Sequence, residues 1–402
     1  MRYVVILGDG MADLPIPALN NKTPLQAAHK PYMDKFARMG IMGRVKTVYD
    51  GLSPGSDVAN LCVMGFDTGK NYTGRSPLEA ASIGVTLSDT DITYRANLVT
   101  LSNEVLYEDK TMVDYSAGEI SSEEAKALIN AVQEALGNEL YSFYAGVSYR
   151  HLLLRKDMKK AGKLTPPHDI SGKKIMEYLP RDKTIYDFMV KSYEILKNHP
   201  VNQKRISEGK NPANSIWIWG EGTKPQLENY REKFGVTGSV ISAVDLIKGI
   251  AILSGLKSID VEGATGTVHT NFDGKTKAAI EALEKGDEFI YLHLEAADES
   301  GHQGSIEDKI KSIELIDEKV VKPVYEYLKK SGEEFRILVL PDHPTPIELK
   351  THTREPVPFV LIKDSDTEEK NNLTYCEEDS DKSGIFIEKG HTLMYNIINN
   401  EI

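Results

Sequence analysis

The chain of 402 residues carries a formal net charge of −12, and hydrophobic residues make up 40% of it. Its length is sufficient for two domains, and its composition is that of an ordinary globular protein. The acidic excess argues against a nucleic-acid-binding surface, because such surfaces need clustered Lys and Arg. No stretch approaches the roughly 18 apolar residues of a membrane span. The two cysteines form no disulfide framework and favour a reducing cytoplasm, where we expect the protein to act.

Four nearly continuous apolar runs are predicted to be buried strands, at residues 3–7, 289–294, 335–340 and 357–362. The segments between the last three runs have helical periodicity. One helix is expected to begin at the Ser305-x-x-Asp308 pattern and to end at Gly332. Strands that alternate with helices predict a doubly wound, mostly parallel α/β sheet.

The middle of the chain has a different character. A helix is expected from Ser121-x-x-Glu124 to Gly137, and a second helical run covers residues 239–254. Strands that end in acidic residues occur only towards the two termini. We therefore expect a core domain made of residues 1–70 and 261–402. A smaller α/β (α+β) domain, residues 71–260, is expected to be inserted in it.

Acidic and imidazole side chains gather at the ends of the predicted core strands. The first strand runs into Asp9, the second through His293 into Asp298 and His302, the third into Asp342 and His343, and His352 precedes the fourth. Ligands of open α/β sheets bind at the carboxyl ends of the strands, so these side chains are expected to converge. A single Asp after a strand is more often a turn or capping residue. The joint Asp and His pattern favours a catalytic Zn²⁺ or Mn²⁺ site.

Ser56 is the candidate nucleophile. It follows Pro54-Gly55 and begins an apolar helical stretch, where backbone N–H groups and the helix dipole favour an incoming phosphate. The alternative is that Ser56 only caps the helix, since serine is a preferred N-cap residue. The sequence has no Gly-x-Ser-x-Gly elbow and no P-loop. A hydroxyl without a neighbouring base would need activation by a coordinating metal.

Short motifs occur along almost the whole chain. In order they are GDGMAD, TPLQAA, PGSDVANL, TGRSPLEAASIGV, DITYRANLVT, GVSYRHLLL, PPHDISGKKI, ISAVDLIKGIA, GATG, HLEAADESGH, PDHPTP and HTREPVPF. Together they resemble the archaeal-type, cofactor-independent phosphoglycerate mutases of the alkaline phosphatase superfamily. The resemblance implies an alkaline-phosphatase-like core with an inserted cap domain.

The resemblance also implies two divalent metal ions and no organic cofactor. One ion would be held by Asp298, His302 and His352, and the other by Asp9, Asp342, His343 and the Ser56 oxygen. Mn²⁺ is the expected ion, and Zn²⁺, Co²⁺ or Mg²⁺ also suit these ligands. By resemblance, Ser56 would take the phosphoryl group from 3-phosphoglycerate, form phosphoserine, and return the group to the 2-hydroxyl of glycerate.

The inserted domain would, by resemblance, close over the site and hold the glycerate. The candidates for this contact are His151, His168, Asp169, Arg75, Arg95, Arg150 and Lys275. Either histidine could instead be a buried structural residue, and Arg and Lys are usually surface groups. His29 and His199 lie in polar segments and are expected at the surface.

One position departs from the family pattern. After GATG the family usually has an acidic residue before Thr-Asn, and this chain has His269. A branch of the family that is close to this sequence is proposed to be homoserine kinase. A metal-dependent phosphotransferase that acts on homoserine is therefore the main alternative to a mutase. A phosphatase or phosphodiesterase with the same ligands, or a metal-binding protein without catalysis, is favoured less.

Overall fold

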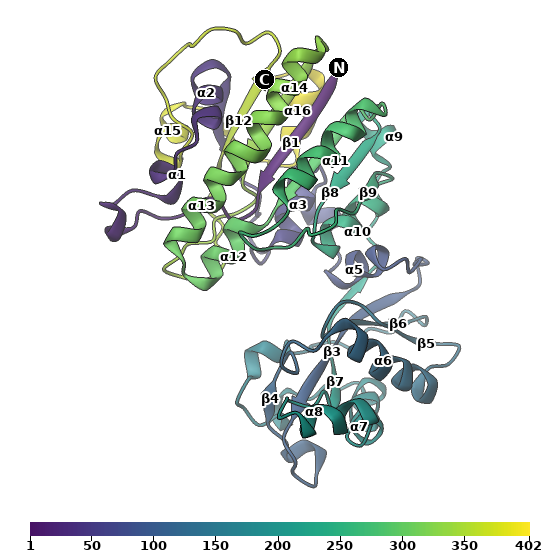
Figure 1. Cartoon of the computed structure of the whole chain (residues 1–402). Coiled ribbons are helices and arrows are strands. Elements are labelled where there is room, and N and C mark those ends of the chain that lie inside the picture. The colour runs from purple at the N-terminus through teal and green to yellow at the C-terminus, as the bar shows by residue number, and fades with distance from the viewer. The chain divides into compact units, whose positions relative to one another are not determined.

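The computed structural model describes residues 1–402, which fold into two compact units (Figure 1). The first unit comprises Met1–Tyr72 and Gln226–Ile402, and the second is Thr73–Pro225. The expected insert was too long at its end, because residues 226–260 belong to the first unit and extend its sheet. None of the helices combines the length and the apolar character needed to cross a bilayer.

The first unit is built on an eight-stranded sheet in the order β13-β2-β12-β11-β1-β10-β8-β9. Its strands are β1 (Arg2–Gly8), β2 (Ile41–Val45), β8 (Gly238–Ile241), β9 (Lys257–Ile259), β10 (Phe289–Leu294), β11 (Phe335–Leu340), β12 (Val357–Lys363) and β13 (Phe386–Ile387). The four predicted strands are confirmed as β1, β10, β11 and β12. The other four have apolar runs too short to stand out. Residues 239–241, predicted as helix, form most of β8.

The direction of β12 has a consequence for the site. It pairs antiparallel with both β11 and β2, whereas the remaining neighbours in the sheet pair in parallel. The mostly parallel α/β sheet is thus confirmed, with one reversed strand. Because β12 is reversed, its N-terminal end lies at the edge of the sheet where β1, β10 and β11 end.

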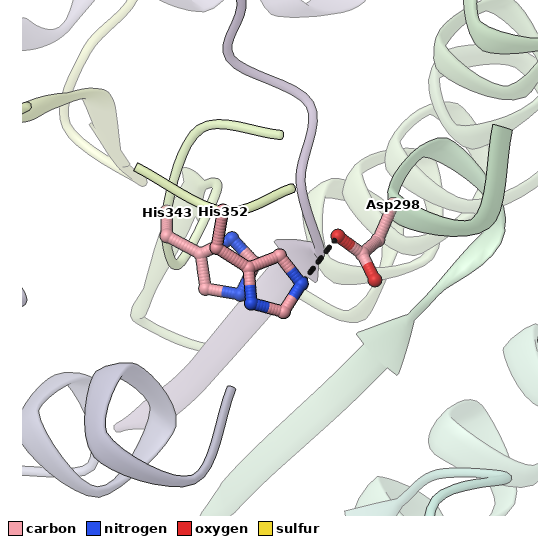
Figure 2. Close-up of side chains that lie close together, drawn as sticks. All are labelled: Asp298, His343 and His352. Atoms are coloured by element: carbon pink, nitrogen blue, oxygen red, sulfur yellow. Dashed lines mark ion pairs between the residues drawn. The ribbon is translucent and has the colours of Figure 1, made fainter. Parts of the chain in front are cut away.

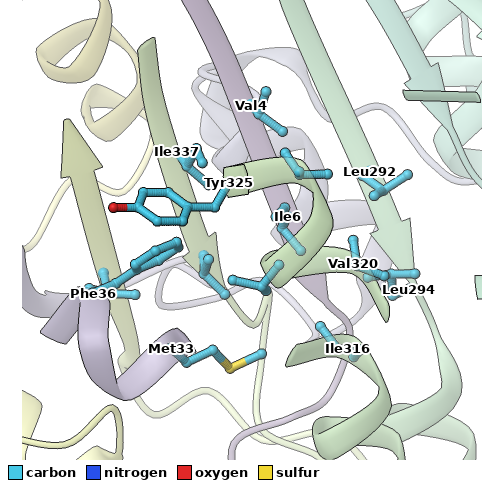
Figure 3. Close-up of a cluster of buried hydrophobic side chains, with 14 of the residues drawn as sticks. Val4, Ile6, Met33, Phe36, Leu292, Leu294, Ile316, Val320, Tyr325 and Ile337 are labelled. Carbon is cyan, nitrogen blue, oxygen red and sulfur yellow. The ribbon is translucent and has the colours of Figure 1, made fainter. Parts of the chain in front are cut away.

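Helices cover both faces of this sheet. One face packs against α2 (Pro31–Met39), α11 (Phe272–Glu284), α13 (Ile306–Ile316) and α14 (Lys322–Ser331). Figure 3 shows this core, which includes Ile6 and Leu292 from the strands and Phe36 and Tyr325 from the helices. Burial of each aliphatic or phenylalanine side chain of this core stabilises the folded state by about 1.5–3 kcal/mol. The helix predicted to end at Gly332 is confirmed as α13 and α14, which a π-helical turn, Asp317–Val321, joins.

The opposite face carries α3 (Ser56–Val63), α10 (Asp245–Leu253) and α16 (Thr392–Asn399). Successive side chains of a strand point to opposite faces of the sheet, so Tyr3 and Tyr291 point away from the core of Ile6 and Leu292 and towards these helices. The Tyr3 hydroxyl donates to the Ile398 carbonyl, and the Tyr291 hydroxyl donates to Asn60. The remaining helices of the unit are α1 (Pro24–Ala27), α4 (Thr68–Asn71), α9 (Tyr230–Phe234), α12 (Ala296–Gln303) and α15 (Glu377–Lys382).

The second unit has an antiparallel sheet centred on β3 (Ile92–Leu101). This strand pairs with β4 (Met112–Asp114), β6 (Arg150–Arg155) and β7 (Ser215–Thr223), and β5 (Tyr141–Tyr144) pairs with β6. The sheet shares a core with α6 (Ser122–Leu136) and α7 (Lys183–Leu196), and α5 (Ser76–Ser82) and α8 (Pro200–Ser207) complete the unit. The predicted cap is confirmed, since the Ser121 side chain accepts from the Glu124 amide and Gly137 ends α6.

A fully buried lysine connects α13 to two loops of the first unit. The Lys309 ammonium donates to Asp13 Oδ2 (2.7 Å), to the Ala12 carbonyl (3.2 Å) and to the Thr345 carbonyl (2.8 Å). Ala12 and Thr345 lie in the loops that follow β1 and β11. These are the loops that carry candidate metal ligands, so Lys309 holds their backbones together.

Replacing Lys309 by methionine is expected to lower the free energy of unfolding by about 3–5 kcal/mol, because the buried Asp13 carboxylate loses its cation. Urea denaturation of the metal-free protein would measure this loss. Lys311→Met is the matched control, since Lys311 is an exposed residue of the same helix and its loss should cost less than about 0.5 kcal/mol. Equal stabilities of the two variants would show that the buried ion pair does not stabilise the fold.

Candidate metal centre

The core sheet brings the predicted ligands to one edge. Asp9 follows β1, Asp298 and His302 lie on α12 directly after β10, Asp342 and His343 follow β11, and His352 precedes the antiparallel β12. The loop after β1 can pass close to α12 because of Gly10, which has φ 66°. A Cβ at this position would lie 2.6 Å from the Cα of Asp298. Any residue other than glycine would therefore push the two ligand-bearing segments apart.

Asp298, His343 and His352 form a first group, whose ligand atoms all lie within 4.8 Å of one another (Figure 2). His352 Nε2 is 3.3 Å from Asp298 Oδ1, and the rings of His343 and His352 have centroids 4.0 Å apart. His302 joins this group, because its Nε2 is 3.3 Å from Asp298 Oδ2 and 2.8 Å from His352 Nε2. These side chains could hold one cation.

Asp9, Asp342 and His343 form a second group, again with ligand atoms within 4.8 Å. His343 Nε2 is 3.6 Å from Asp9 Oδ1 and 3.4 Å from Asp342 Oδ2. Ser56 Oγ lies 3.2 Å from the same nitrogen. His343 therefore belongs to both groups, whereas the sequence-based assignment placed it in the second only.

The charges of this site fit a divalent cation. Burial, with the nearby charges of Asp342 and Asp298, raises the pKa of Asp9 well above its usual value. The Oδ1 atom of Asp9 is buried and has no hydrogen-bond partner. A bound metal ion would relieve both the repulsion and the unsatisfied oxygen. Burial also acts to raise the pKa of Asp298, but hydrogen bonds with His302 and His352 outweigh it and hold that pKa well below the usual value.

Ser56 is not the capping residue of α3. Gly55 occupies the N-cap position, and the Ser56 hydroxyl contacts the His343 ring. The structure therefore does not support the alternative in which Ser56 only caps the helix. Its oxygen lies at the second ligand group, which suits a nucleophile that a metal activates.

Two further polar side chains contact these ligands: Thr345, which was not predicted, and His293, which was expected to converge with them. The Thr345 hydroxyl donates to Asp298 Oδ1 and lies 3.3 Å from His343 Nδ1. His293 Nε2 is 3.1 Å from Asp9 Oδ2, and burial lowers the pKa of His293 to about 4. The position of His293 within the strand before Asp298 was noticed in the sequence. Its contact with Asp9 depends on the pairing of β1 with β10.

The second unit gathers three predicted arginines around Glu79. The Glu79 carboxylate is 2.9 Å from Arg75 Nε and 3.0 Å from Arg95 Nε. Burial acts to raise the pKa of Glu79, but the charges of Arg95, Arg75 and Arg150 outweigh it and lower the pKa. One carboxylate among three guanidinium groups leaves a net positive cluster that suits an anion.

His168 lies next to this cluster. Its ring centroid is 5.4 Å from that of Trp219, and the Arg95 guanidinium carbon is 4.4 Å from the Trp219 centroid. Asp169 Oδ1 is 3.6 Å from His168 Nε2, and both side chains are largely exposed. The structure thus brings His168 together with Arg95 through the indole ring of Trp219, a residue that was not predicted.

His151 and Lys275 have different surroundings. His151 is buried, its Nδ1 accepts from the Gly146 amide (3.1 Å), its Nε2 has no partner, and burial lowers its pKa to about 3. Its side chain and that of its neighbour Arg150 point to opposite faces of β6. Lys275 belongs to the first unit, where its buried ammonium donates to the His293 carbonyl (3.2 Å) and burial lowers its pKa to about 8.

The remaining histidines named from the sequence lie outside both clusters. His29 is exposed, as predicted, and His269 is exposed in the loop before α11. His199 is half-buried, because its ring accepts from the Val201 amide and caps α8. His269, the residue that departs from the family pattern, thus faces solvent.

Comparisons with known proteins agree in what they indicate. The family described as 2,3-bisphosphoglycerate-independent phosphoglycerate mutase matches residues 37–202. The chain is 50% identical to the 2,3-bisphosphoglycerate-independent phosphoglycerate mutase of Methanosarcina barkeri, over 98% of each chain. It is also 50% identical, again over 98% of each chain, to the probable enzyme of the same name from Geobacter sulfurreducens.

Two solved structures share the fold. A protein from Pyrococcus horikoshii matches with a TM-score of 0.81 and 30% identity, over 100% of this chain and 98% of that one. A cofactor-independent phosphoglycerate mutase from Thermoplasma acidophilum matches with a TM-score of 0.65 and 24% identity, over 99% and 98% of the two chains. Identity of this extent along almost the entire length shows that the chain belongs to the 2,3-bisphosphoglycerate-independent phosphoglycerate mutase family and is an isomerase of that family.

Proposed function

We propose that the chain interconverts 3-phosphoglycerate and 2-phosphoglycerate through a phosphoserine formed on Ser56, without 2,3-bisphosphoglycerate. One observation carries the proposal: Ser56 Oγ lies 3.2 Å from the Nε2 atom of His343, the residue that the two ligand groups share. The names of the relatives support the substrate. A serine beside two candidate cation sites suits phosphoryl transfer, in which charge stabilisation and positioning supply most of the catalysis.

Two divalent ions complete the proposed site. The first would be held by Asp298, His302 and His352, and the second by Asp9, Asp342, His343 and Ser56. His343 belongs to both ligand groups and would also contact the first ion. Mn²⁺ is the ion we expect, and Zn²⁺, Co²⁺ or Mg²⁺ suit the same oxygen and nitrogen donors. When bound, the ions would lower the pKa of the serine hydroxyl and stabilise negative charge on the transferred group.

The transfer takes two steps. Ser56 Oγ attacks the phosphorus in line, and the bond from phosphorus to the 3-oxygen of glycerate breaks. The 2-hydroxyl of the retained glycerate then attacks the phosphoserine, and the bond to Ser56 breaks. Each departing oxygen takes up a proton as the attacking hydroxyl loses one, so the overall reaction is an isomerisation.

Residues of the second unit are proposed to hold the glycerate. The positive cluster of Arg75, Arg95 and Arg150 around Glu79 suits its carboxylate, and His168 with Asp169 suits its hydroxyl groups and their protons. His151 could contribute its buried, unpartnered Nε2. Lys275, whose pKa burial lowers to about 8, is the proposed anion contact of the first unit.

A second candidate activity follows from His269, where the family usually has an acidic residue. This exposed side chain lies in the loop before α11, the helix that carries Lys275, so the residue that departs from the family pattern leaves the metal ligands unchanged. The alternative is transfer of a phosphoryl group from a nucleotide to homoserine by the same centre.

One assay distinguishes the two activities. Purified protein loaded with Mn²⁺ would be given 3-phosphoglycerate without bisphosphoglycerate, and in parallel ATP with homoserine. We expect 2-phosphoglycerate at roughly tens of turnovers per second, within the usual range of enzymes, and no product after chelation of the metal. Formation of phosphohomoserine in place of 2-phosphoglycerate would reject the mutase proposal.

A further inference from the structure

A buried asparagine lies between the candidate nucleophile and a candidate metal ligand. Asn60 is fully buried on α3, one turn after Ser56. Its Nδ2 donates to the Ser56 carbonyl (2.9 Å) and to Asp342 Oδ2 (2.8 Å). Its Oδ1 accepts from the Tyr291 hydroxyl (2.6 Å). The amide uses both N–H groups and its oxygen, and no part of it faces solvent.

These contacts determine which way the amide points. A tyrosine hydroxyl that donates to the amide oxygen leaves the amide nitrogen facing its two acceptors. If the amide were flipped, its oxygen would face the Asp342 carboxylate and the Ser56 carbonyl, and three acceptors would meet without a donor. Tyr291 is itself fully buried on β10, a central strand, so it provides a rigid reference for the amide.

The amide in turn orients the Asp342 carboxylate. Asp342 Oδ1 accepts from the backbone amides of Gly10 (3.2 Å) and His343 (2.8 Å). Asn60 supplies the side-chain donor to the other oxygen, Oδ2, which lies 3.4 Å from His343 Nε2. With both oxygens held, the carboxylate has one orientation relative to Asp9 and His343. Loss of a partner of this kind typically lowers metal affinity by about 10- to 100-fold.

We propose that Asn60, oriented by Tyr291, is a positioning residue that holds Asp342 and the first turn of α3 in the geometry needed for metal binding and phosphoryl transfer. The inference rests on the proposed function to the extent that the second ligand group must hold a metal ion. It adds to that function a buried chain of hydrogen bonds, Tyr291 to Asn60 to Asp342, that joins β10, α3 and the loop after β11.

Metal affinity tests this role without relying on turnover. Mn²⁺ binding to the wild type, Asn60→Leu and Tyr291→Phe would be measured by competition with a chelator and by the EPR signal of free Mn²⁺. For Asn60→Leu we expect a loss of about 10- to 100-fold in affinity for one of two Mn²⁺ ions, the usual effect of losing a partner that orients a ligand. Tyr291→Phe removes one hydrogen bond and should lower the affinity for the same ion by about 5-fold.

A second buried tyrosine provides the control. Tyr375 is also fully buried in the first unit, and its hydroxyl donates to the Pro358 carbonyl (3.0 Å), which is not a ligand contact. Tyr375→Phe should therefore lose a comparable hydrogen bond and bind both Mn²⁺ ions as the wild type does.

The outcomes separate the two proposals. Wild-type affinity for both ions in folded Asn60→Leu would overturn the positioning role and leave the metal centre standing. If that variant does not fold, unchanged affinity in Tyr291→Phe would overturn it equally. A wild-type protein that binds fewer than two Mn²⁺ ions would reject the two-metal centre, and the inference about Asn60 with it.

Discussion

Replacing Ser56 by alanine is expected to abolish phosphoryl transfer and to leave the fold intact. The variant loses the proposed nucleophile, so turnover should fall by on the order of 10⁴-fold or more, as when a covalent nucleophile is removed from other enzymes. Metal binding should weaken only modestly, because the second ligand group keeps Asp9, Asp342 and His343. The assay with 3-phosphoglycerate would give the turnover, and the intact mass after brief exposure to substrate would show the phosphorylated wild type.

A serine of the same loop serves as the control. Ser53 is exposed and lies three residues before Ser56, so Ser53→Ala changes a hydroxyl of the same segment outside the ligand groups. It should keep wild-type turnover and still become phosphorylated. Turnover close to that of the wild type in Ser56→Ala would contradict the phosphoserine mechanism, as would phosphorylation of that variant at another residue.

The core strands could be predicted because burial on both faces leaves a continuous apolar run. The strands β1, β10, β11 and β12 are such runs, and their predicted limits agree with the structure to within one residue at each end. The strand β2 could not be found this way, since its five residues include Gly43 and Arg44. Its pairing with β12 comes from tertiary contacts that local sequence does not encode.

The convergence of the candidate metal ligands was likewise predictable from their place at strand ends. What the sequence could not indicate is that His343 lies close to both ligand groups. That property depends on the reversed direction of β12, which brings His352 to the side of the His343 ring. A parallel β12 would have placed the segment before it at the other edge of the sheet.

The supporting residues were less accessible to sequence reasoning. Asn60 lies four residues after Ser56 and could have been noticed as the residue above it on the helix. Its partner Tyr291 is 231 residues away along the chain and resembles any other aromatic residue of a buried strand. Trp219 was missed for the same reason, since its contacts with Arg95 and His168 arise from strand pairing and loop packing.

Removal of His343 should have a larger effect on metal content than removal of any other histidine of the site. Its side chain belongs to both ligand groups, so His343→Ala is expected to weaken both Mn²⁺ sites. His352 lies in the first group only, so His352→Ala should weaken the binding of one ion and leave the binding of the other unchanged. Each affected site should lose more than about 100-fold in affinity, beyond the effect of losing an outer partner.

Metal content after dialysis, measured by elemental analysis, distinguishes these patterns. The wild type should retain two Mn²⁺ ions per chain, His352→Ala one, and His343→Ala none. His29→Ala, which changes an exposed histidine of the same unit, should retain both. The loss of a single ion from His343→Ala, or of both from His352→Ala, would show that the two groups do not share this imidazole. The proposed position of Ser56, which rests on its contact with His343, would then need revision.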